Sequence, residues 1–240
     1  MRPTPEVRPI KQLKRTIRQL VGYKPRIKSK SDPLPNRVLA AEGITGWFSR
    51  RECRRLYLTA AMTAGPVLEI GHFLGRSTAC ICEAIRDVGK PRVFRSYDLG
   101  FRSSAEFKEY YDRLHRSDVP VPVEYEELVF SRGTTTTEVA LSNLRELGLD
   151  RFVQLTSGDA FQLDHEKYEL IFCDASHDLH EIEANLPHLV ARSNRGCIWA
   201  LHDMNQANIE KVIALAKVEF CELTGSLATF VYLGGDPTAS

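Results

Sequence analysis

The sequence lacks any apolar run long enough to cross a membrane. No stretch reaches the roughly eighteen apolar residues that a transmembrane helix needs. The N-terminus is basic but has neither the apolar core nor the small-residue cleavage site of a secretion signal. A bundle of membrane helices is thereby excluded, and we expect a soluble, cytoplasmic chain that is not exported.

The cysteines lack the spacing of a zinc site and that of a disulfide-rich scaffold. The six cysteines are scattered along the chain, and several fall inside apolar runs: Cys53, Cys80, Cys82, Cys173, Cys197 and Cys221. This pattern is typical of reduced, mostly buried thiols in a cytosolic protein.

Acidic residues are nearly absent from the first thirty positions. That segment holds ten Lys or Arg against one Glu, and the remainder holds 22 against 30, so an arm of charge +9 precedes a body of charge −8. Prolines interrupt residues 1–36, but apolar side chains from Ile10 to Val21 recur at helical spacing. We predict a basic, Pro-rich arm with one short amphipathic helix. It packs on the body, on a second subunit of a homo-oligomer or on a membrane surface; nucleic acid is the weaker alternative, because aromatic residues are not interleaved with the basic ones.

Short apolar runs alternate with amphipathic stretches in the rest of the chain. A helical cap is predicted over 37–66, and the core over 67–240. The predicted strands are 67–70, 93–97, 152–156, 170–173, 197–201, 218–223 and 227–233, and the predicted helices are 49–61, 77–88, 137–147, 179–190 and 209–220. The last two strands are joined by only three residues, so they must be antiparallel. The expected fold is α/β: a doubly wound, Rossmann-like sheet of seven strands with an antiparallel last strand.

Residues 99–133 break this alternation. They hold six aromatic residues among many charges and are too long for an ordinary connection. We predict an insertion near the functional site that acts as a lid and excludes water.

A glycine-rich turn follows the first predicted strand. Gly71 and Gly75 let the backbone turn sharply, so that a ligand can approach the N-terminus of the next helix, where free N–H groups favour an anion. Ser77 can add a hydroxyl to a carboxylate bound there. The same turn also occurs between strand and helix where no ligand binds.

An acidic residue follows the second predicted strand. Asp98 lies 27 residues after Gly71, at the carboxyl edge of the neighbouring strand, where a carboxylate can accept hydrogen bonds from two ribose hydroxyls. By itself Asp98 is also compatible with an ordinary turn carboxylate. The turn and the acid together indicate a ligand that contains a nucleoside.

These motifs resemble those of class I S-adenosylmethionine-dependent methyltransferases. Glu69-Ile-Gly71-x-x-x-Gly75-x-Ser77, Asp98, Gly158-Asp159-Ala160 and Asp174 occur in that family's order. The nearest pattern is that of small-molecule O-methyltransferases akin to the macrolide-sugar and catechol enzymes, and it covers about residues 44–233. The resemblance implies methyl transfer from S-adenosylmethionine to a hydroxyl of a small molecule, such as a sugar or glycosylated metabolite.

The resemblance also implies which residues bind the cofactor. Gly71, His72, Phe73 and Ser77 would line its methionine part, Asp98 would hold the ribose, Asp159 and Ala160 would face the adenine, and Asp174 would lie close to the reactive methyl group. Glu69, Gly75 and Gly158 complete the predicted cofactor-binding set.

The predicted catalytic residues follow two neighbouring strands: Asp174, His177, His202 and Asp203. Methyl transfer to a hydroxyl requires removal of a proton, and an unperturbed histidine suits this at neutral pH. His177 is the first choice for the base, because catechol-type enzymes place theirs three residues after the equivalent of Asp174. His202 is the second choice.

A magnesium ion is a further hypothesis. Asp174 and Asp203 match two carboxylate ligands of the metal-dependent relatives, and Mg²⁺ would lower the pKa of the substrate hydroxyl. The third ligand of those relatives is replaced by Met204, and Asn205 lies one place further on. In the alternative interpretation, Asp203 orients His177 or His202 through a hydrogen bond.

Two other functions are alternatives to methyl transfer. A nicotinamide-dependent oxidoreductase is disfavoured because the turn lacks a third glycine in the required register and the chain ends in a hairpin. A non-catalytic cofactor-binding domain tethered through its arm stays open. Of the 18 charges in residues 121–190, 14 are acidic, which suits a cationic sulfonium and argues against nucleic acid as a partner.

Overall fold

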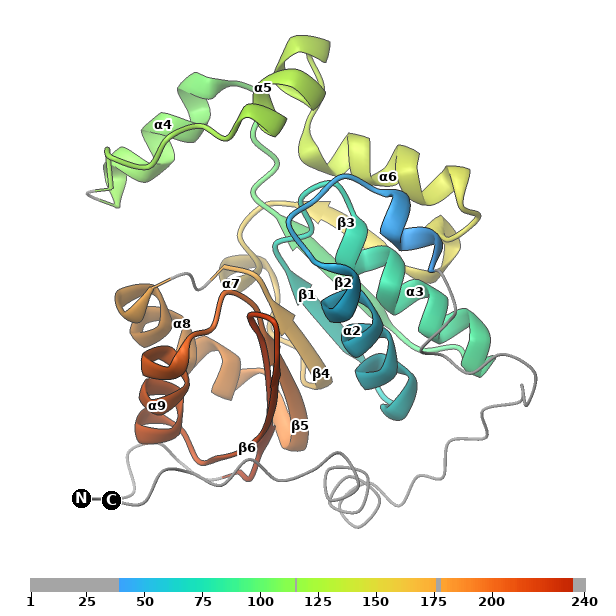
Figure 1. Cartoon of the computed structure of the whole chain (residues 1–240), viewed down its shortest axis with the longest axis vertical. Coiled ribbons are helices and arrows are strands. Elements are labelled where there is room, and N and C mark those ends of the chain that lie inside the picture. Colours follow the sequence, from blue (N-terminus) through green and yellow to red (C-terminus); the bar gives the residue numbers. More distant parts are fainter. Residues whose placement is uncertain (1–38, 115, 176–177, 235–240) are drawn as a thin grey trace.

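The structure, a computed structural model, describes residues 39–114, 116–175 and 178–234. The predicted arm (1–36) and His177 therefore lie outside the described residues. The elements, shown in Figure 1, are η2 (Ala40–Gly43), α2 (Arg50–Met62), β1 (Val67–Ile70), α3 (Arg76–Val88), β2 (Phe94–Asp98), α4 (Ser104–Arg113), α5 (Val123–Leu128), η3 (Phe130–Arg132), α6 (Thr136–Glu146), η4 (Asp150–Phe152), β3 (Gln154–Ser157), α7 (Ala160–Leu163), β4 (Tyr168–Cys173), α8 (Leu179–Ala191), β5 (Ser193–Leu201), α9 (Gln206–Leu215), β6 (Val218–Thr224) and β7 (Leu227–Tyr232).

The strands form one seven-stranded sheet in the order β3-β2-β1-β4-β5-β7-β6. The first five strands are mutually parallel, with Val67 of β1 opposite Phe94 of β2 and Leu170 of β4. β7 runs antiparallel to both of its neighbours, β5 and β6. The predicted fold class is confirmed. The strand order reverses beside β1, and ligands of doubly wound sheets bind at the carboxyl ends of strands at such a point.

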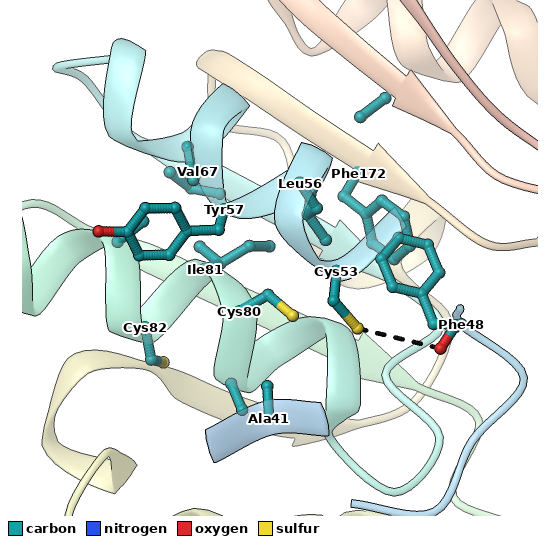
Figure 2. Packing of buried hydrophobic residues seen from close by; sticks show 14 of the residues in the cluster. Ala41, Phe48, Cys53, Leu56, Tyr57, Val67, Cys80, Ile81, Cys82 and Phe172 are labelled. Atoms are coloured by element: carbon teal, nitrogen blue, oxygen red, sulfur yellow. Dashed lines mark hydrogen bonds between the residues drawn. The ribbon is translucent and has the colours of Figure 1, made fainter. Parts of the chain in front are cut away.

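Two apolar layers sandwich the sheet, because successive side chains of each strand point to opposite faces. Val67 of β1 packs with α2 and α3, while Leu68 packs with α8 and α9 on the other face. Figure 2 shows part of the first layer, with Cys53 of α2 and Cys80 of α3 inside it. All six cysteines are free and buried, as predicted.

The last helix is shorter than predicted. The prediction extended it to 220, but α9 ends at Leu215 and β6 begins at Val218. Val218 and Phe220 pair with Tyr232 and Phe230 of β7. Residues 218–220 therefore form strand hydrogen bonds and do not continue the helix. The hairpin is antiparallel as predicted, and its second strand inserts between β5 and β6.

The insertion folds into α4, α5 and η3, which lie beyond the two helical layers at one end of the sheet (Figure 1). Aromatic rings hold it together and bring it over the site: the ring of Tyr125 lies 5.4 Å from that of Phe107 and 4.9 Å from that of Phe73, which follows β1. The Arg116 guanidinium then pairs with Asp178, 2.6 Å away, at the start of α8. The insertion thus spans the carboxyl edge of the sheet. In the described part of the chain, no helix has the length and apolarity to cross a membrane.

Candidate functional site

The glycine turn after β1 is in the predicted place and is tightly packed. Gly71 has a φ of +86°, and a Cβ there would lie 2.8 Å from the backbone oxygen of Asp174, so only glycine fits without a shift. Gly75 has a φ of +92° and caps α3. Phe73, between them, is in the left-handed region with a φ of 45°, which is uncommon for a non-glycine residue and recurs at functional sites.

Asp98 is the last residue of β2, and its carboxylate is bound to the turn. The backbone N–H of Phe73 donates to Asp98 Oδ2 at 2.9 Å. Oδ1 accepts from Gly100 N at 3.0 Å and from the Thr136 hydroxyl at 2.6 Å. A carboxylate offers about four acceptor positions. Three are in use, so one is left for a ribose hydroxyl where the sequence predicted two.

Glu69 and Ser77, both in the predicted cofactor set, lie behind the turn. Glu69 is fully buried in β1 and accepts hydrogen bonds of 2.6–2.7 Å from the hydroxyls of Ser77, Thr78 and Ser96. The Ser77 hydroxyl therefore points at Glu69, and not at a ligand carboxylate as predicted. Burial raises the pKa of Glu69 to about 7 despite the three hydroxyl donors.

The His72 side chain likewise points inward. It is 1% exposed, with Nδ1 3.0 Å from the Ser96 hydroxyl and Nε2 3.2 Å from the Thr137 hydroxyl. Burial lowers the pKa of this imidazole, so it is neutral at physiological pH. Only the His72 backbone is therefore placed to line the predicted methionine pocket.

The predicted adenine-binding residues reach the same edge of the sheet. The Gly158 N–H donates to the Asp98 backbone oxygen at 2.7 Å, and Asp159 caps α7 by accepting from Phe161 N at 2.8 Å. Ala160 is 2% exposed. Their contact with an adenine stays a prediction.

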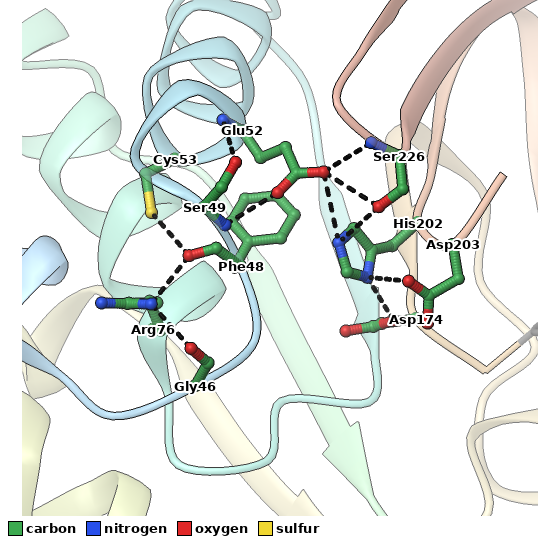
Figure 3. A network of polar contacts seen from close by, with 10 residues as sticks. All are labelled: Gly46, Phe48, Ser49, Glu52, Cys53, Arg76, Asp174, His202, Asp203 and Ser226. Atoms are coloured by element: carbon green, nitrogen blue, oxygen red, sulfur yellow. Dashed lines mark hydrogen bonds and ion pairs between the residues drawn. The ribbon is translucent and has the colours of Figure 1, made fainter.

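A charged network lies at the ends of β4 and β5 (Figure 3). His202 is 3% exposed, and its Nδ1 lies 2.9 Å from Asp174 Oδ1 and 3.4 Å from Asp203 Oδ1. Its Nε2 lies 3.1 Å from the Ser226 hydroxyl and 3.6 Å from Glu52 Oε1. The imidazole thus bridges carboxylates from α2 and from two strand ends.

This arrangement keeps His202 protonated. Burial lowers the pKa of His202, but contacts with Asp174 and Glu52 and the charges of Asp174 and Asp203 outweigh burial and raise it to about 10. Burial by itself would raise the pKa of Glu52, yet its bonds with His202, Ser49 and Ser226 hold it well below the usual range. A histidine that is already protonated does not accept a proton at neutral pH. The geometry therefore favours a positioning role for His202 over its predicted role as second-choice base.

The described residues offer a poor donor set for the predicted Mg²⁺ site. Ligand atoms of Asp174, His202 and Asp203 lie within 4.8 Å of one another, but one of these three donors is an imidazole nitrogen, and His202 Nδ1 contacts both carboxylates. Mg²⁺ prefers oxygen ligands in octahedral geometry. Asn205 uses its side-chain oxygen to cap α9 by accepting from Asn208 N, and Met204 is buried. The contact of Asp203 with His202 agrees with the alternative that Asp203 orients this histidine.

Local sequence patterns do not assign several residues to the site. Ser49 and Glu52 match a helix-capping motif, and they do form that capping box, but nothing in the motif shows that Glu52 Oε1 also reaches His202 and the Ser226 N–H. Trp47, 55% exposed, stacks on Phe73 with ring centroids 4.6 Å apart. Thr136 follows the insertion, and only the fold brings it to Asp98.

Arg76, the first residue of α3, ties the cap segment to the turn. Its guanidinium donates to the backbone oxygens of Glu42, Gly46 and Phe48, each at 2.7 Å. Two of these bonds are visible in Figure 3. They hold the loop that carries Trp47 against the start of α3.

The geometry agrees with the comparisons with known proteins. A model of the family described as a methyltransferase domain matches residues 68–204. No curated protein sequence matches the chain significantly.

Solved methyltransferase structures share the fold. An S-adenosylmethionine-dependent O-methyltransferase from Thermotoga maritima is 12% identical, with a TM-score of 0.52 over 83% of this chain and 73% of that one. A methyltransferase from Geobacter sulfurreducens is 15% identical, with a TM-score of 0.50 over 85% and 92% of the two chains. At these identities the similarity concerns the fold.

Proposed function

The chain belongs to the methyltransferase-domain family, with the class I S-adenosylmethionine-dependent fold, and we propose that it methylates a hydroxyl of a small molecule. Family membership disfavours the nicotinamide-dependent alternative. The non-catalytic alternative is decided by the assay described below.

One observation carries the proposal: two aspartates flank the glycine turn at the point where the strand order reverses. Phe73 N binds the Asp98 carboxylate on one side, and Gly71 packs against the Asp174 backbone on the other. This pair of groups suits a nucleoside sulfonium, because one carboxylate can accept from a ribose hydroxyl and the other places negative charge near the cation. Thr136 and Gly100 hold the Asp98 carboxylate, and His202 holds that of Asp174.

Each residue then has a defined task. S-adenosylmethionine, when bound, supplies an electrophilic methyl group. Asp98 binds a ribose hydroxyl, while the Asp174 carboxylate, 28% exposed and held by His202, faces the sulfonium end. The insertion shields this edge from water. His177 keeps its predicted role as the base, by resemblance to catechol-type enzymes.

The charge of the body supports a small acceptor over nucleic acid. The stretch 121–190 has 14 acidic residues among 18 charges and includes Asp159 and Asp174 of the site. Nucleic-acid binding depends on neutralising phosphates with basic side chains. The carboxylates of Asp159 and Asp174 place negative charge at the site itself, which opposes a polyanionic substrate.

The proposal is tested with ¹³C-methyl S-adenosylmethionine and a panel of small hydroxyl compounds, including sugars and glycosylated metabolites. We expect a product whose labelled carbon has the NMR shift of an O-methyl group. His177→Ala should lower kcat by about 10²–10⁴ and leave cofactor affinity unchanged. The matched control is His165→Ala, at an exposed position away from the site. Label on nitrogen, or no transfer at all, would contradict the proposal. Equal kcat in the wild type and His177→Ala would remove His177 from the mechanism.

A further inference from the structure

Four consecutive threonines, Thr134 to Thr137, lie at the start of α6. Two of them, Thr136 and Thr137, form hydrogen bonds with residues at or just after the ends of three strands. Thr137 bridges His72, after β1, and Ser157, at the end of β3, with distances of 3.2 Å and 2.8 Å. Thr136 donates to Asp98, at the end of β2. This first turn of helix follows directly from the insertion, so it joins the lid segment to the predicted cofactor edge.

The Thr136 hydroxyl can act only through Asp98. Its side chain is fully buried, so it does not touch a ligand, and its hydroxyl is committed to Asp98 Oδ1 at 2.6 Å. Together with Gly100 N it fills both acceptor positions of that oxygen. Phe73 N takes one position of Oδ2. With the described residues as donors, the one acceptor position left on Asp98 is therefore on Oδ2, the oxygen that faces the turn.

Neighbouring contacts keep Thr136 from rotating away. Thr135 caps α6 in a reciprocal capping box with Glu138, and Thr137 is held by His72 and Ser157. A hydrogen bond to a charged acceptor stabilises more than one between neutral groups. The carboxylate is thus preorganised before a ligand arrives, which reduces the ordering cost of binding.

We infer that Thr136 is a positioning residue for the cofactor ribose, an inference that rests on the proposed function. It fixes the Asp98 carboxylate so that Oδ2 offers its remaining acceptor position to one ribose hydroxyl. The methyl group and the acceptor lie outside this contact. Loss of the Thr136 hydroxyl therefore weakens cofactor binding and leaves the chemical step intact.

The test compares the full chain with Thr136→Val, Thr136→Ser and Thr134→Val. Valine keeps the shape of threonine and removes the hydroxyl, whereas serine keeps the hydroxyl. Thr134→Val is the matched control, because the Thr134 hydroxyl donates to the Val129 backbone oxygen, 3.2 Å away, and not to the site. Affinity for S-adenosylhomocysteine is measured by calorimetry, and kcat and KM for S-adenosylmethionine with the acceptor found in the assay above.

We expect Thr136→Val to raise the dissociation constant and KM about tenfold with kcat within about twofold of wild type, which corresponds to 1.4 kcal/mol of binding free energy. Thr136→Ser should restore affinity to within about threefold, and Thr134→Val should match wild type. Unchanged or tighter binding by Thr136→Val, or equal losses in Thr136→Val and Thr134→Val, would overturn the inference while wild type still binds. Absence of binding by wild type would instead contradict the proposed function on which it rests.

Discussion

Two buried glutamates, one on each side of the candidate site, have opposite ionisation behaviour. Glu69, 0% exposed, is surrounded by hydroxyls and has its pKa raised to about 7, chiefly by burial. Glu52, 3% exposed, lies beside His202 and has its pKa held well below the usual range, although burial opposes this. Both side chains are shielded from solvent, but Glu69 lies deeper and has only neutral hydroxyl donors, whereas Glu52 has a cationic partner, so depth and partner together decide the outcome.

The site has a neutral half, around Glu69 behind the glycine turn, and a charged half, around His202 at the ends of β4 and β5. Behind the turn, hydroxyl dipoles satisfy the acceptors of Glu69 but do not replace its lost hydration. At the ends of β4 and β5, one imidazolium compensates several carboxylates, and removing one partner of such a buried group is costly. Under the proposed function, the uncharged nucleoside lies at the neutral half and the sulfonium at the charged half.

The largest expected effect on the free energy of unfolding comes from removing the cation of the charged half, the His202 imidazolium. His202→Ala leaves Glu52 buried without its charged partner, and we expect the free energy of unfolding to fall by about 3–5 kcal/mol in urea denaturation at pH 7. His180→Ala, at an exposed position, is the control and should change it by less than about 0.5 kcal/mol. A loss below about 1 kcal/mol in His202→Ala would show that the network is not held by charge.

The raised pKa of Glu69, in the neutral half, should make the free energy of unfolding depend on pH. A carboxyl whose folded pKa lies above its unfolded value of 4.5 contributes stability that is present at low pH and is lost as the pH rises through about 7. Between pH 4.5 and 8, stability of wild type should therefore fall by about 3 kcal/mol relative to Glu69→Gln. The same comparison with Glu146→Gln, an exposed glutamate of α6, should show no such slope. Parallel pH profiles for wild type and Glu69→Gln would contradict the raised pKa.

The smallest expected effect comes from removing one hydroxyl behind the turn. Thr78→Val deletes a donor to Glu69 while keeping the buried side chain's shape, so it destabilises the charged form of Glu69 most. We expect a loss of about 1 kcal/mol at pH 5 and about 2 kcal/mol at pH 8, measured by urea denaturation. An equal loss at both values would mean that Thr78 contributes packing alone.

Sequence patterns predicted the positions of the glycine turn and Asp98 better than the full set of partners in the charged network. Gly71, Gly75 and Asp98 are local signals, because backbone turns and strand ends impose their residue types over a few positions. Glu52 and Ser226 lie 174 residues apart and meet only because β7 inserts beside β5, a pairing that no local pattern encodes.

The inward-pointing side chains were missed for a related reason. A strand-to-helix motif shows which residues are near a ligand, but the rotation of His72 and Ser77 toward the core depends on Ser96 and Glu69 of the sheet. The end of α9 was misplaced because apolar periodicity continues into β6, where pairing with β7 takes over.

Calorimetric titration of the full chain with S-adenosylmethionine, S-adenosylhomocysteine and NADH tests the central claim most directly. We predict saturable binding of the first two ligands at one site per chain, unchanged by EDTA or added Mg²⁺, no binding of NADH, and loss of binding in Asp98→Ala. Binding of NADH, no binding of S-adenosylmethionine, or wild-type affinity in Asp98→Ala would contradict the claim that the glycine turn and Asp98 form the cofactor site.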